Sequence, residues 1–257
     1  MKKAFCCTHF SILSLVVFSS LLPVKSSGQK TLEVTFTHPY IAKGELVEHA
    51  YYTLQYSEEH EQPYWAAYKL SPSFLVKNVK RSNHFKADKT IATGSATLAD
   101  YKGSGYDRGH LAPAGSMTFD KTAMDESFYL SNMSPQVPGF NRGVWKKLES
   151  KVRTWTYASD SIYVVTGPVF NKTTKTIGPN HVTVPHAYYK VLLRFQNDKT
   201  TAIAFLLENK KSSDSLSYFA TSIDAIELAT GIDFNAGIQD DIEVRLESNY
   251  DLADWGL

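Results

Sequence analysis

Cysteine is scarce in this sequence: Cys6 and Cys7 are the only two among 257 residues. Both lie in an N-terminal segment that has the composition of a secretory signal peptide, so cleavage would leave a mature chain without thiols. Disulfide bonds and thiolate metal sites are then excluded, and the hydrophobic core alone must stabilise the domain. With 43% hydrophobic residues, the chain has enough apolar material for one sizeable core in one large domain.

The N-terminal segment begins with two lysines, continues as an apolar, serine-rich run over residues 10–24 and ends in the small residues 26–28. The run has the length of a signal-peptide core and is short for a membrane span. We therefore predict a signal peptide over residues 1–28 and a secreted or periplasmic protein; an anchor that is never cleaved is the alternative. No later run is long and apolar enough to span a bilayer, so no membrane partner is expected after cleavage.

The chain also lacks an excess of charge of either sign, with 27 cationic and 26 anionic side chains. Loss of Lys2, Lys3 and Lys25 with the signal peptide leaves 24 cationic against 26 anionic side chains, a net charge of −2. A nucleic-acid-binding protein of this composition needs its basic groups gathered in one place. One predicted helix carries four basic residues, which form either such a face or an ordinary solvated one. These are Lys146, Lys147, Lys151 and Arg153.

Internal repeats, heptad arrays and low-complexity tracts are absent as well, so nothing divides the chain into an array of small units. A linker is predicted over residues 29–46. Beyond it, strand-like and helix-like segments are mixed without a βαβ rhythm. This order favours an α+β fold, with a central, largely antiparallel β-sheet flanked by helices. One domain is expected over residues 47–257.

Residues that favour strands concentrate in five runs bounded by turn residues. The first two are expected to form a hairpin around HEQP, and the third to be a buried strand that ends at Gly167-Pro168. The last two are expected to be strands joined by a turn at QNDK. The runs cover residues 51–56, 64–70, 161–170, 188–195 and 201–208.

Two stretches are predicted to be helical. In residues 141–157, apolar side chains recur at a spacing of four, at Val144, Leu148 and Val152, with charges between them. A second helix is expected over residues 223–229. Its predicted N-cap is Ser222, and its predicted end is Thr230-Gly231.

The stretch YDRGHLAPAGSM, residues 106–117, places Asp, Arg and His side by side between glycines. A core strand would not use that set, and a surface turn needs neither Arg108 nor His110. A fixed neutral imidazole is a natural general base near neutral pH. Arg108 lies on the same side as His110 if the stretch is extended, and would favour a bound phosphate. Taken alone, His110 could also be structural or merely exposed.

A second group of polar residues lies in LSNMSPQVPGFNRGVWKKLESKVR, residues 130–153. Asn132 and Asn141 are nine apart, and Glu149 follows eight residues after Asn141, on roughly the same side of a helix. An Asn helix cap with a solvated Glu is one interpretation. The other is an oxygen-ligand site for a hard cation such as Mg²⁺, which commonly takes one or two protein oxygens and keeps several waters.

Together these residues resemble the DNA/RNA non-specific endonucleases of the ββα-metal (His-Me finger) class. The family's DRGH signature stands at Asp107–His110, and its Asn-rich block as NMSPQ followed by FNRGVWKKLE. RSNHFKAD, residues 81–88, resembles the family's Arg-and-Asp segment, and VVTGPVF, VPHAYYKV and IELATGIDF resemble its later core segments. The resemblance covers residues 47–234 and implies a ββα-metal active-site motif within the α+β fold.

The resemblance implies a role for each matching residue. His110 would be the general base that activates water, Asn141 the direct ligand of one Mg²⁺, and Glu149 a ligand through a metal-bound water. Asn132 would position His110 or the substrate. Three arginines would contact phosphate oxygens and stabilise the charge of the pentacoordinate state: Arg81, Arg108 and Arg153.

The implied enzyme is a Mg²⁺-dependent endonuclease that hydrolyses phosphodiester bonds of DNA and, as the family name suggests, of RNA. Mn²⁺ or another divalent cation is the alternative metal, and the oligomeric state is left open. Phosphate groups and one metal carry little sequence information, so a site that contacts only these accepts many sequences. Asp107 and Gly109 are expected to shape a turn rather than to take part in chemistry.

Three other functions stay open: a non-catalytic nucleic-acid-binding relative, a metal-dependent phosphodiesterase for small nucleotides or lipid head groups, and a secreted carbohydrate-binding module. The last leaves DRGH unexplained. His181 and His186 could begin a Zn²⁺ site, but a structural or surface role is favoured because no third ligand is in sight. Aromatic residues between Tyr51 and Tyr68 could stack on bases. A role in core packing is favoured for them.

Overall fold

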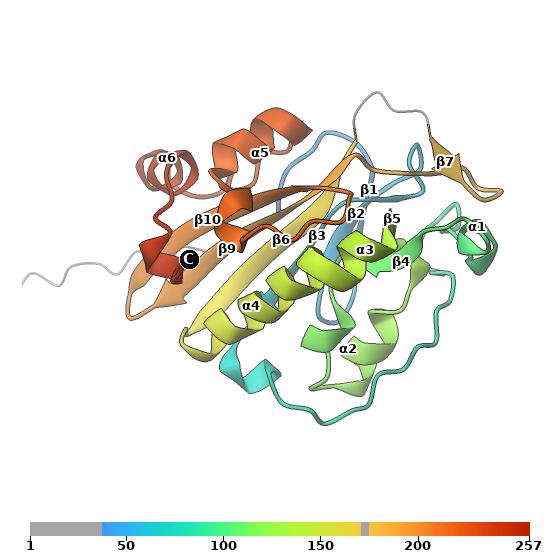
Figure 1. The fold of residues 1–257 in the computed structure, drawn as a ribbon, viewed down its shortest axis with the longest axis horizontal. Helices are drawn as coiled ribbons and strands as arrows, with labels where there is room; N and C mark the ends of the chain where they lie inside the picture. The colour runs from blue at the N-terminus through green and yellow to red at the C-terminus, as the bar shows by residue number, and fades with distance from the viewer. Residues whose placement is uncertain (1–37, 171–174) are drawn as a thin grey trace, which may run out of the picture. The chain divides into compact units, whose positions relative to one another are not determined.

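The computed structural model describes residues 38–170 and 175–257. The predicted signal peptide, and residues 29–37 of the predicted linker, lie outside the described residues. A seven-stranded sheet forms the centre of the described part (Figure 1), and every pair of neighbouring strands in it is antiparallel. The α+β fold with a largely antiparallel sheet is thus confirmed. In sheet order the strands are β1 Glu45–Glu48, β2 Thr53–Ser57, β3 Gln62–Leu70, β6 Ser161–Val169, β9 Ala187–Gln196, β10 Lys199–Glu208 and β11 Ala220–Thr221.

The predicted hairpin is present as β2 and β3, but its turn is shorter than expected. Gln62 and Pro63, assigned to the turn from the sequence, are the first residues of β3. Pro63 faces Tyr56 where the register between the two strands shifts. Proline has no amide hydrogen to donate to a regular β-ladder, and a bulge tolerates this because the ladder is interrupted there.

The three later strands follow the prediction more closely. β6 runs through Gly167-Pro168 and ends at Val169, so the expected end was too early. β9 and β10 are joined at Asn197 and Asp198, both of which have positive φ, 49° and 62°. A two-residue turn with two positive φ angles matches the twist of the flanking strands, and Asn and Asp adopt it readily.

Helices lie on both faces of the sheet (Figure 1). The side chains of Leu148 and Val152 pack into one core cluster together with Tyr188 and Leu192 of β9. Side chains of the C-terminal helices pack into the other, which includes Val191. A buried Leu or Val side chain contributes about 1.5–3 kcal/mol, so each helix is firmly held. The helices are α1 Leu98–Tyr101, α2 Lys121–Glu126, α3 Pro138–Phe140, α4 Lys146–Tyr157, α5 Ile223–Thr230 and α6 Asp240–Ser248.

The helix predicted over residues 141–157 is not regular throughout. Asn141–Trp145 forms a π-turn, and α4 proper begins at Lys146. Gly143 leaves helical geometry inside that turn, with φ −103° and ψ −112°, in line with the low helix propensity of glycine. Short 3₁₀ turns occur elsewhere, at η1 Pro72–Phe74, η2 Ala114–Ser116, η3 Leu130–Asn132, η5 Leu216–Phe219 and η6 Ala253–Trp255.

The predicted ends of α5 are confirmed. The Ser222 hydroxyl accepts a hydrogen bond from the amide of Ala225, 3.2 Å away, and Gly231 closes the helix with a φ of 69°. Among the described residues, no helix has the length and apolar character needed to cross a membrane.

Part of the predicted linker belongs to the folded domain. The backbone of Tyr40 exchanges two hydrogen bonds with Asp233, of 2.7 and 3.0 Å. Glu45 and Leu46 are the first residues of β1 and pair with β2. The prediction that the domain begins at Val47 was therefore wrong: main-chain pairing extends the fold towards the N-terminus.

Two small antiparallel ladders stand apart from the main sheet. β7 Thr176–Ile177 pairs with β8 Val182–Thr183. β4 Asp107–His110 pairs with β5 Met133–Gln136, and the helical segment α3–α4 follows directly. This is the ββα arrangement that the sequence predicts. DRGH is thus a strand and not a turn. A Cβ at position 109 would overlap the side chain of Gln136, so glycine is required by close packing.

Candidate active site

His110 ends β4 with its side chain buried between two phenylalanine rings. The imidazole packs edge-on against Phe128, with ring centroids 4.9 Å apart, and is tilted against Phe85 at 5.7 Å. Burial, aided by the charges of Arg81 and Arg108, lowers the pKa of His110 to about 3. The imidazole is therefore neutral at physiological pH, which is the form that accepts a proton.

The same two rings carry the two guanidinium groups nearest to His110. Arg108 Cζ lies 4.0 Å from the centroid of the Phe85 ring, and Arg81 Cζ lies 4.8 Å from that of Phe128. Arg108 and His110 both contact Phe85, as expected if the stretch is extended. Neither arginine forms an ion pair with another described residue. Two cationic groups without a bound carboxylate therefore flank the imidazole.

Asn132, at the end of η3, is fully buried and uses its whole amide on the main chain. Its Oδ1 accepts from the Ala112 amide at 2.9 Å, and its Nδ2 donates to the carbonyls of Ala112 and Ser127, each at 2.9 Å. With every polar atom engaged, Asn132 has no group left for substrate. It fixes the backbone two residues beyond His110.

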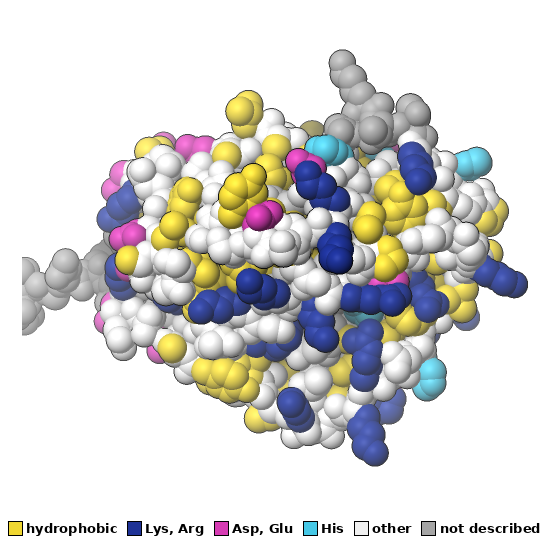
Figure 2. Space-filling model, viewed as in Figure 1, with side chains coloured by type: hydrophobic (Ala, Val, Ile, Leu, Met, Phe, Trp, Pro, Cys, Tyr) yellow, Lys and Arg dark blue, Asp and Glu magenta, His cyan; other side chains and the backbone are white. Residues whose placement is uncertain are grey.

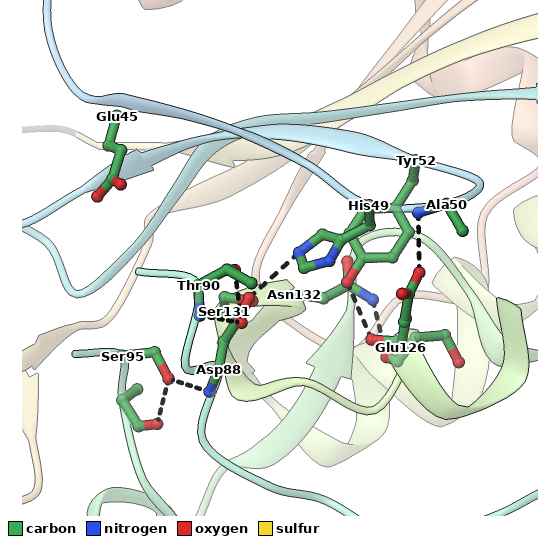
Figure 3. Close-up of polar contacts among 12 residues, drawn as sticks. Glu45, His49, Ala50, Tyr52, Asp88, Thr90, Ser95, Glu126, Ser131 and Asn132 are labelled. Carbon is green, nitrogen blue, oxygen red and sulfur yellow. Dashed lines mark hydrogen bonds and ion pairs between the residues drawn. The ribbon is translucent and has the colours of Figure 1, made fainter. Parts of the chain in front are cut away.

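A buried carboxylate holds η3 against the segment that carries Arg81 (Figure 3). Asp88 Oδ2 accepts from Ser131 Oγ at 2.6 Å and lies 3.1 Å from His49 Nε2, while Asp88 Oδ1 accepts from Thr90. Burial alone would raise the pKa of Asp88, but these hydrogen bonds lower it to about 2. The sequence identified this Asp only as part of RSNHFKAD, and His49 was not singled out at all.

Asn141 opens the π-turn and is oriented by Asp107. Its Nδ2 donates to Asp107 Oδ2 at 2.8 Å. A carboxylate accepts and never donates, so this contact fixes which end of the Asn141 amide faces Asp107 and turns Oδ1 away from it. Arg142 completes the arrangement, with Nε 2.8 Å from Asp107 Oδ2 and Nη2 2.6 Å from Oδ1.

The strand below anchors this turn. The ring of Tyr188 in β9 stacks on the ring of Phe140, with centroids 5.3 Å apart, and its centroid lies 5.7 Å from that of Trp145. Phe140 precedes Asn141 in the chain and Trp145 follows it. The Tyr188 hydroxyl also bonds to the Pro135 carbonyl of β5 at 2.9 Å. One buried side chain thus joins the main sheet, β5 and the π-turn.

Glu149 lies half-buried in the first turn of α4, surrounded by cations. Burial raises the pKa of this carboxyl, and the charges of Lys190, Arg153, Arg81 and Lys146 oppose that rise. Lys190 is fully buried in β9 below α4, with Nζ 4.6 Å from the centroid of the Trp145 ring.

Arg153 lies one helical turn beyond Glu149. Its Nη2 donates to Ser150 Oγ at 2.9 Å, and a Cβ at Gly115 would lie 3.3 Å from its Nη1. The guanidinium group therefore packs over η2, the turn that follows His110. This contact connects α4 directly with the DRGH strand.

The structure thus links the candidate residues through shared neighbours. The charge of Arg81 acts on the pKa of both His110 and Glu149. The charge of Arg108 acts on the pKa of His110 and of Asp107, which holds Asn141. The residues expected to bind metal, accept a proton and contact phosphate come from β4, the π-turn, α4 and the segment before α1, and lie in one region.

The basic face predicted on this helix is partly present. Lys146 and Lys147 are exposed, whereas Lys151 is half-buried with its Nζ 5.5 Å from the centroid of the Trp155 ring. Figure 2 shows Lys and Arg side chains gathered over α4 and the adjoining surface, with few Asp or Glu between them. Near-zero net charge therefore conceals a local excess of positive charge.

The residues set aside from the sequence behave as expected. His181 and His186 are exposed. Tyr52, Tyr56 and Tyr68 are buried core side chains rather than a stacking platform. Two residues of the site were missed, and only the first left a signal in the sequence. These are Lys190, a charge inside the apolar run AYYKVLL, and Asp107, whose role needs the fold to bring it to Asn141.

The comparisons with known proteins point to one family. The family model for DNA/RNA non-specific endonucleases matches residues 32–241. Mitochondrial endonuclease G of Bos taurus is 36% identical over 74% of this chain and 69% of its own length. Nuclease C1 of Cunninghamella echinulata var. echinulata is 37% identical over 74% of this chain and 82% of its own. A chain in the crystal structure of the EndoG/EndoGI complex superposes with a TM-score of 0.73 and 33% identity, over 78% of this chain and 89% of that one.

Fold and site define a metal-dependent nuclease of the ββα class. The chain belongs to the DNA/RNA non-specific endonuclease family. It is accordingly an endonuclease that acts on nucleic acid with a divalent metal.

Proposed function

We propose that the protein is an exported, Mg²⁺-dependent endonuclease that hydrolyses phosphodiester bonds of DNA and RNA without regard to sequence. The observation that carries this proposal is the buried, neutral imidazole of His110 beside two guanidinium groups, Arg81 and Arg108, that have no ion-pair partner among the described residues. A phosphodiester needs a base for the attacking water and positive charge around phosphorus, and this arrangement offers both.

The oxygen donors of the site fit a hard cation. Asn141 turns its amide nitrogen towards Asp107, so Oδ1 is left for a metal. Glu149 offers a half-buried carboxylate that would hold the ion through water. One direct oxygen ligand and one water-mediated ligand suit Mg²⁺, which keeps several waters of its own. When bound, the ion would neutralise charge on the phosphate group and polarise water.

The residues of the chain divide the remaining work. His110 takes the proton from the attacking water. Arg81, Arg108 and Arg153 bind phosphate oxygens and stabilise the charge that grows as the pentacoordinate state forms. Asn132 is a positioning residue, because its amide is bonded to the main chain that follows His110.

A cleavage assay tests the proposal. The mature protein is incubated with supercoiled plasmid and with single-stranded RNA, in Mg²⁺ or in EDTA, beside His110→Ala. We expect the wild type to cleave both substrates in Mg²⁺ and not in EDTA. We expect the variant to cleave neither substrate. Loss of plasmid alone would restrict the enzyme to DNA. Cleavage by His110→Ala at the wild-type rate would exclude His110 as the base.

Export is the part of the proposal that concerns residues 1–28. It rests on their sequence: a basic start, an apolar run and small residues. Several relatives carry "mitochondrial" in their names, a statement about those proteins. Expression of the full chain in a bacterial host, followed by N-terminal sequencing of the protein outside the cytoplasm, tests this point. A cytoplasmic product that keeps Met1 would contradict it.

A further inference from the structure

A groove of about 550 Å³ opens beside the Asn141–Asp107 pair. Its walls come from α1, β4 and the π-turn. Lys102, Arg108 and Arg142 bring positive charge to it, and Tyr101 and Tyr106 bring aromatic rings. Because Asn141 and Arg108 belong both to the groove and to the candidate active site, the two are continuous.

The charge of the groove is markedly positive. Its one carboxylate, Asp107, already accepts hydrogen bonds from Asn141 and Arg142. Lys102 is exposed and has no ion-pair partner among residues 38–170 and 175–257. The groove therefore offers cationic groups that are not neutralised, as a phosphodiester strand requires.

A second groove of nearly equal size shows that this charge is not a general property of the surface. It measures about 590 Å³ and lies between the β9–β10 turn and the C-terminal residues. Three carboxylates there, Asp198, Asp251 and Asp254, outnumber Lys199 and Arg245, and Lys199 Nζ is bonded to Asp254 at 2.9 Å. Size does not distinguish the two grooves, but charge does.

The aromatic residues of the first groove add a surface for the rest of a nucleotide. Tyr106 is partly exposed, and its hydroxyl accepts from Lys175 Nζ at 2.8 Å, which orients the ring. The Tyr101 hydroxyl is buried and has no hydrogen-bond partner within the described part of the chain. A ring that is held in place can pack on any base or sugar, independent of sequence.

We infer that this groove is a subsite for the nucleotide next to the scissile phosphate, with Lys102 on its phosphate and Tyr106 on its base or sugar. The inference rests on the proposed function and deepens it. It gives the enzyme a binding contact that does not depend on the metal ligands or on His110. Binding at this subsite carries no sequence information, in agreement with a non-specific nuclease.

The test is the salt dependence of binding. A short fluorescein-labelled single-stranded DNA is titrated with the mature protein in EDTA, so that nothing is cleaved, and anisotropy is followed over a series of salt concentrations. Each phosphate contact contributes about 0.7 to the slope of log K against log salt for a single strand. We expect Lys102→Ala to lower the slope by about that amount and to weaken binding several-fold at low salt.

Lys199→Ala is the matched control, because it removes one lysine from the rim of the acidic groove. We expect wild-type slope and affinity from it. For the aromatic contact, Tyr106→Ser is expected to bind about tenfold more weakly, the typical loss of one base–aromatic contact. Tyr106→Phe keeps the ring and is expected to restore most of the affinity.

Two results would overturn the inference in different ways. If Lys102→Ala and Tyr106→Ser bind DNA with the wild-type affinity and slope while the wild type cleaves plasmid in Mg²⁺, the subsite is wrong and the proposed function stands. If the folded wild type neither binds the labelled DNA nor cleaves plasmid, the proposed function fails and the subsite fails with it. Thermal melting of each variant confirms that it is folded.

Discussion

At the scale of single residues, the chemistry depends on how burial sets the state of His110. Its ring is enclosed by Phe85 and Phe128, and the nearby guanidinium groups disfavour a second proton. A proton-accepting imidazole would otherwise be partly charged at pH 6. Because the pKa is lowered to about 3, the imidazole stays neutral well below neutral pH.

We predict that His110→Ala lowers kcat by about 10²–10⁴-fold, the usual contribution of a general base. Folding should survive, since the lost ring is replaced by a smaller apolar group. His186→Ala, which removes an exposed histidine, is the control. Steady-state kinetics on DNA, with circular dichroism of both variants, measures the effect; a matching loss in His186→Ala would point to a general disturbance.

Asp107 should act on the metal rather than on the substrate. Its hydrogen bond fixes the Asn141 amide, and loss of such an orienting partner commonly costs 10–100-fold in metal affinity. We predict that Asp107→Ala raises the half-saturating Mg²⁺ concentration by about that factor. The dissociation constant of Mn²⁺, measured by paramagnetic resonance, should rise in parallel.

Arg142→Ala is the comparison for Asp107→Ala. It removes the two hydrogen bonds that the guanidinium group donates to Asp107 and keeps the Asn141 side chain that bonds to the same carboxylate. Metal affinity should then stay within about twofold of the wild type, since a solvent-exposed ion pair contributes little. Equal losses in both variants would show that the ion pair, and not the amide contact, matters.

Sequence and structure differ most instructively at this scale. His110, Asn141 and Glu149 were singled out from the sequence because their types and spacing are distinctive. Asp107 was assigned to a turn because the sequence does not show that DRGH pairs with MSPQ and faces Asn141. Asn132 was placed near substrate or base, and only the structure shows that its amide is fully used by the main chain.

At the scale of elements, the segment around Asp88 and the helix α4 determine whether the site forms. Asp88 attaches the segment that carries Arg81 to η3, which carries Asn132. Its pKa falls from 3.8 to about 2 on folding. A carboxyl whose folded pKa is depressed stabilises the native state above its unfolded value, and this contribution is lost as pH falls through the folded value.

We predict that Asp88→Asn lowers the free energy of unfolding by about 2 kcal/mol near neutral pH. The difference from the wild type should shrink between about pH 4 and pH 2, where the wild-type carboxylate takes up a proton. Urea unfolding at several pH values measures it. Glu58→Gln, at an exposed carboxylate, serves as control, and a pH-independent difference for Asp88→Asn would contradict the linkage.

The platform under the site is α4, and Leu148 is its fully buried contact with the sheet. We predict that Leu148→Ala destabilises the protein by about 2–5 kcal/mol, as for other buried leucines. Lys147→Ala, one residue earlier and exposed, should stay within about 0.5 kcal/mol of the wild type. Denaturant titration compares them, and similar values would mean that α4 is not anchored through this face.

Element positions were largely predictable, and the exceptions have physical causes. Apolar periodicity and turn residues identified the β9–β10 pair and α5 almost to the residue. The π-turn was not foreseen because the contacts on both sides of it are tertiary: Phe140 and Trp145 both pack on Tyr188. Residues 40–46 were assigned to a linker because main-chain pairing with Asp233 and β2 leaves no pattern in side-chain types.

At the scale of the whole molecule, charge is distributed unevenly. The exposed lysines of α4 belong to a face on which positive side chains predominate (Figure 2). We predict that replacing both Lys146 and Lys147 by alanine weakens DNA binding uniformly across sequences and lowers the salt slope by up to about 1.4 for a single strand. Binding of the wild type that does not weaken from low to moderate salt would exclude this face as a nucleic-acid contact.

The edge strands of the central sheet are far shorter than its middle strands. β9 and β10 have ten residues each, whereas the outermost strands, β1 and β11, have four and two. At the β1 edge, an incoming strand from another molecule would meet only four residues, and Glu45 and Glu48 place charge along it. This short, charged edge is a built-in protection against aggregation through strand pairing.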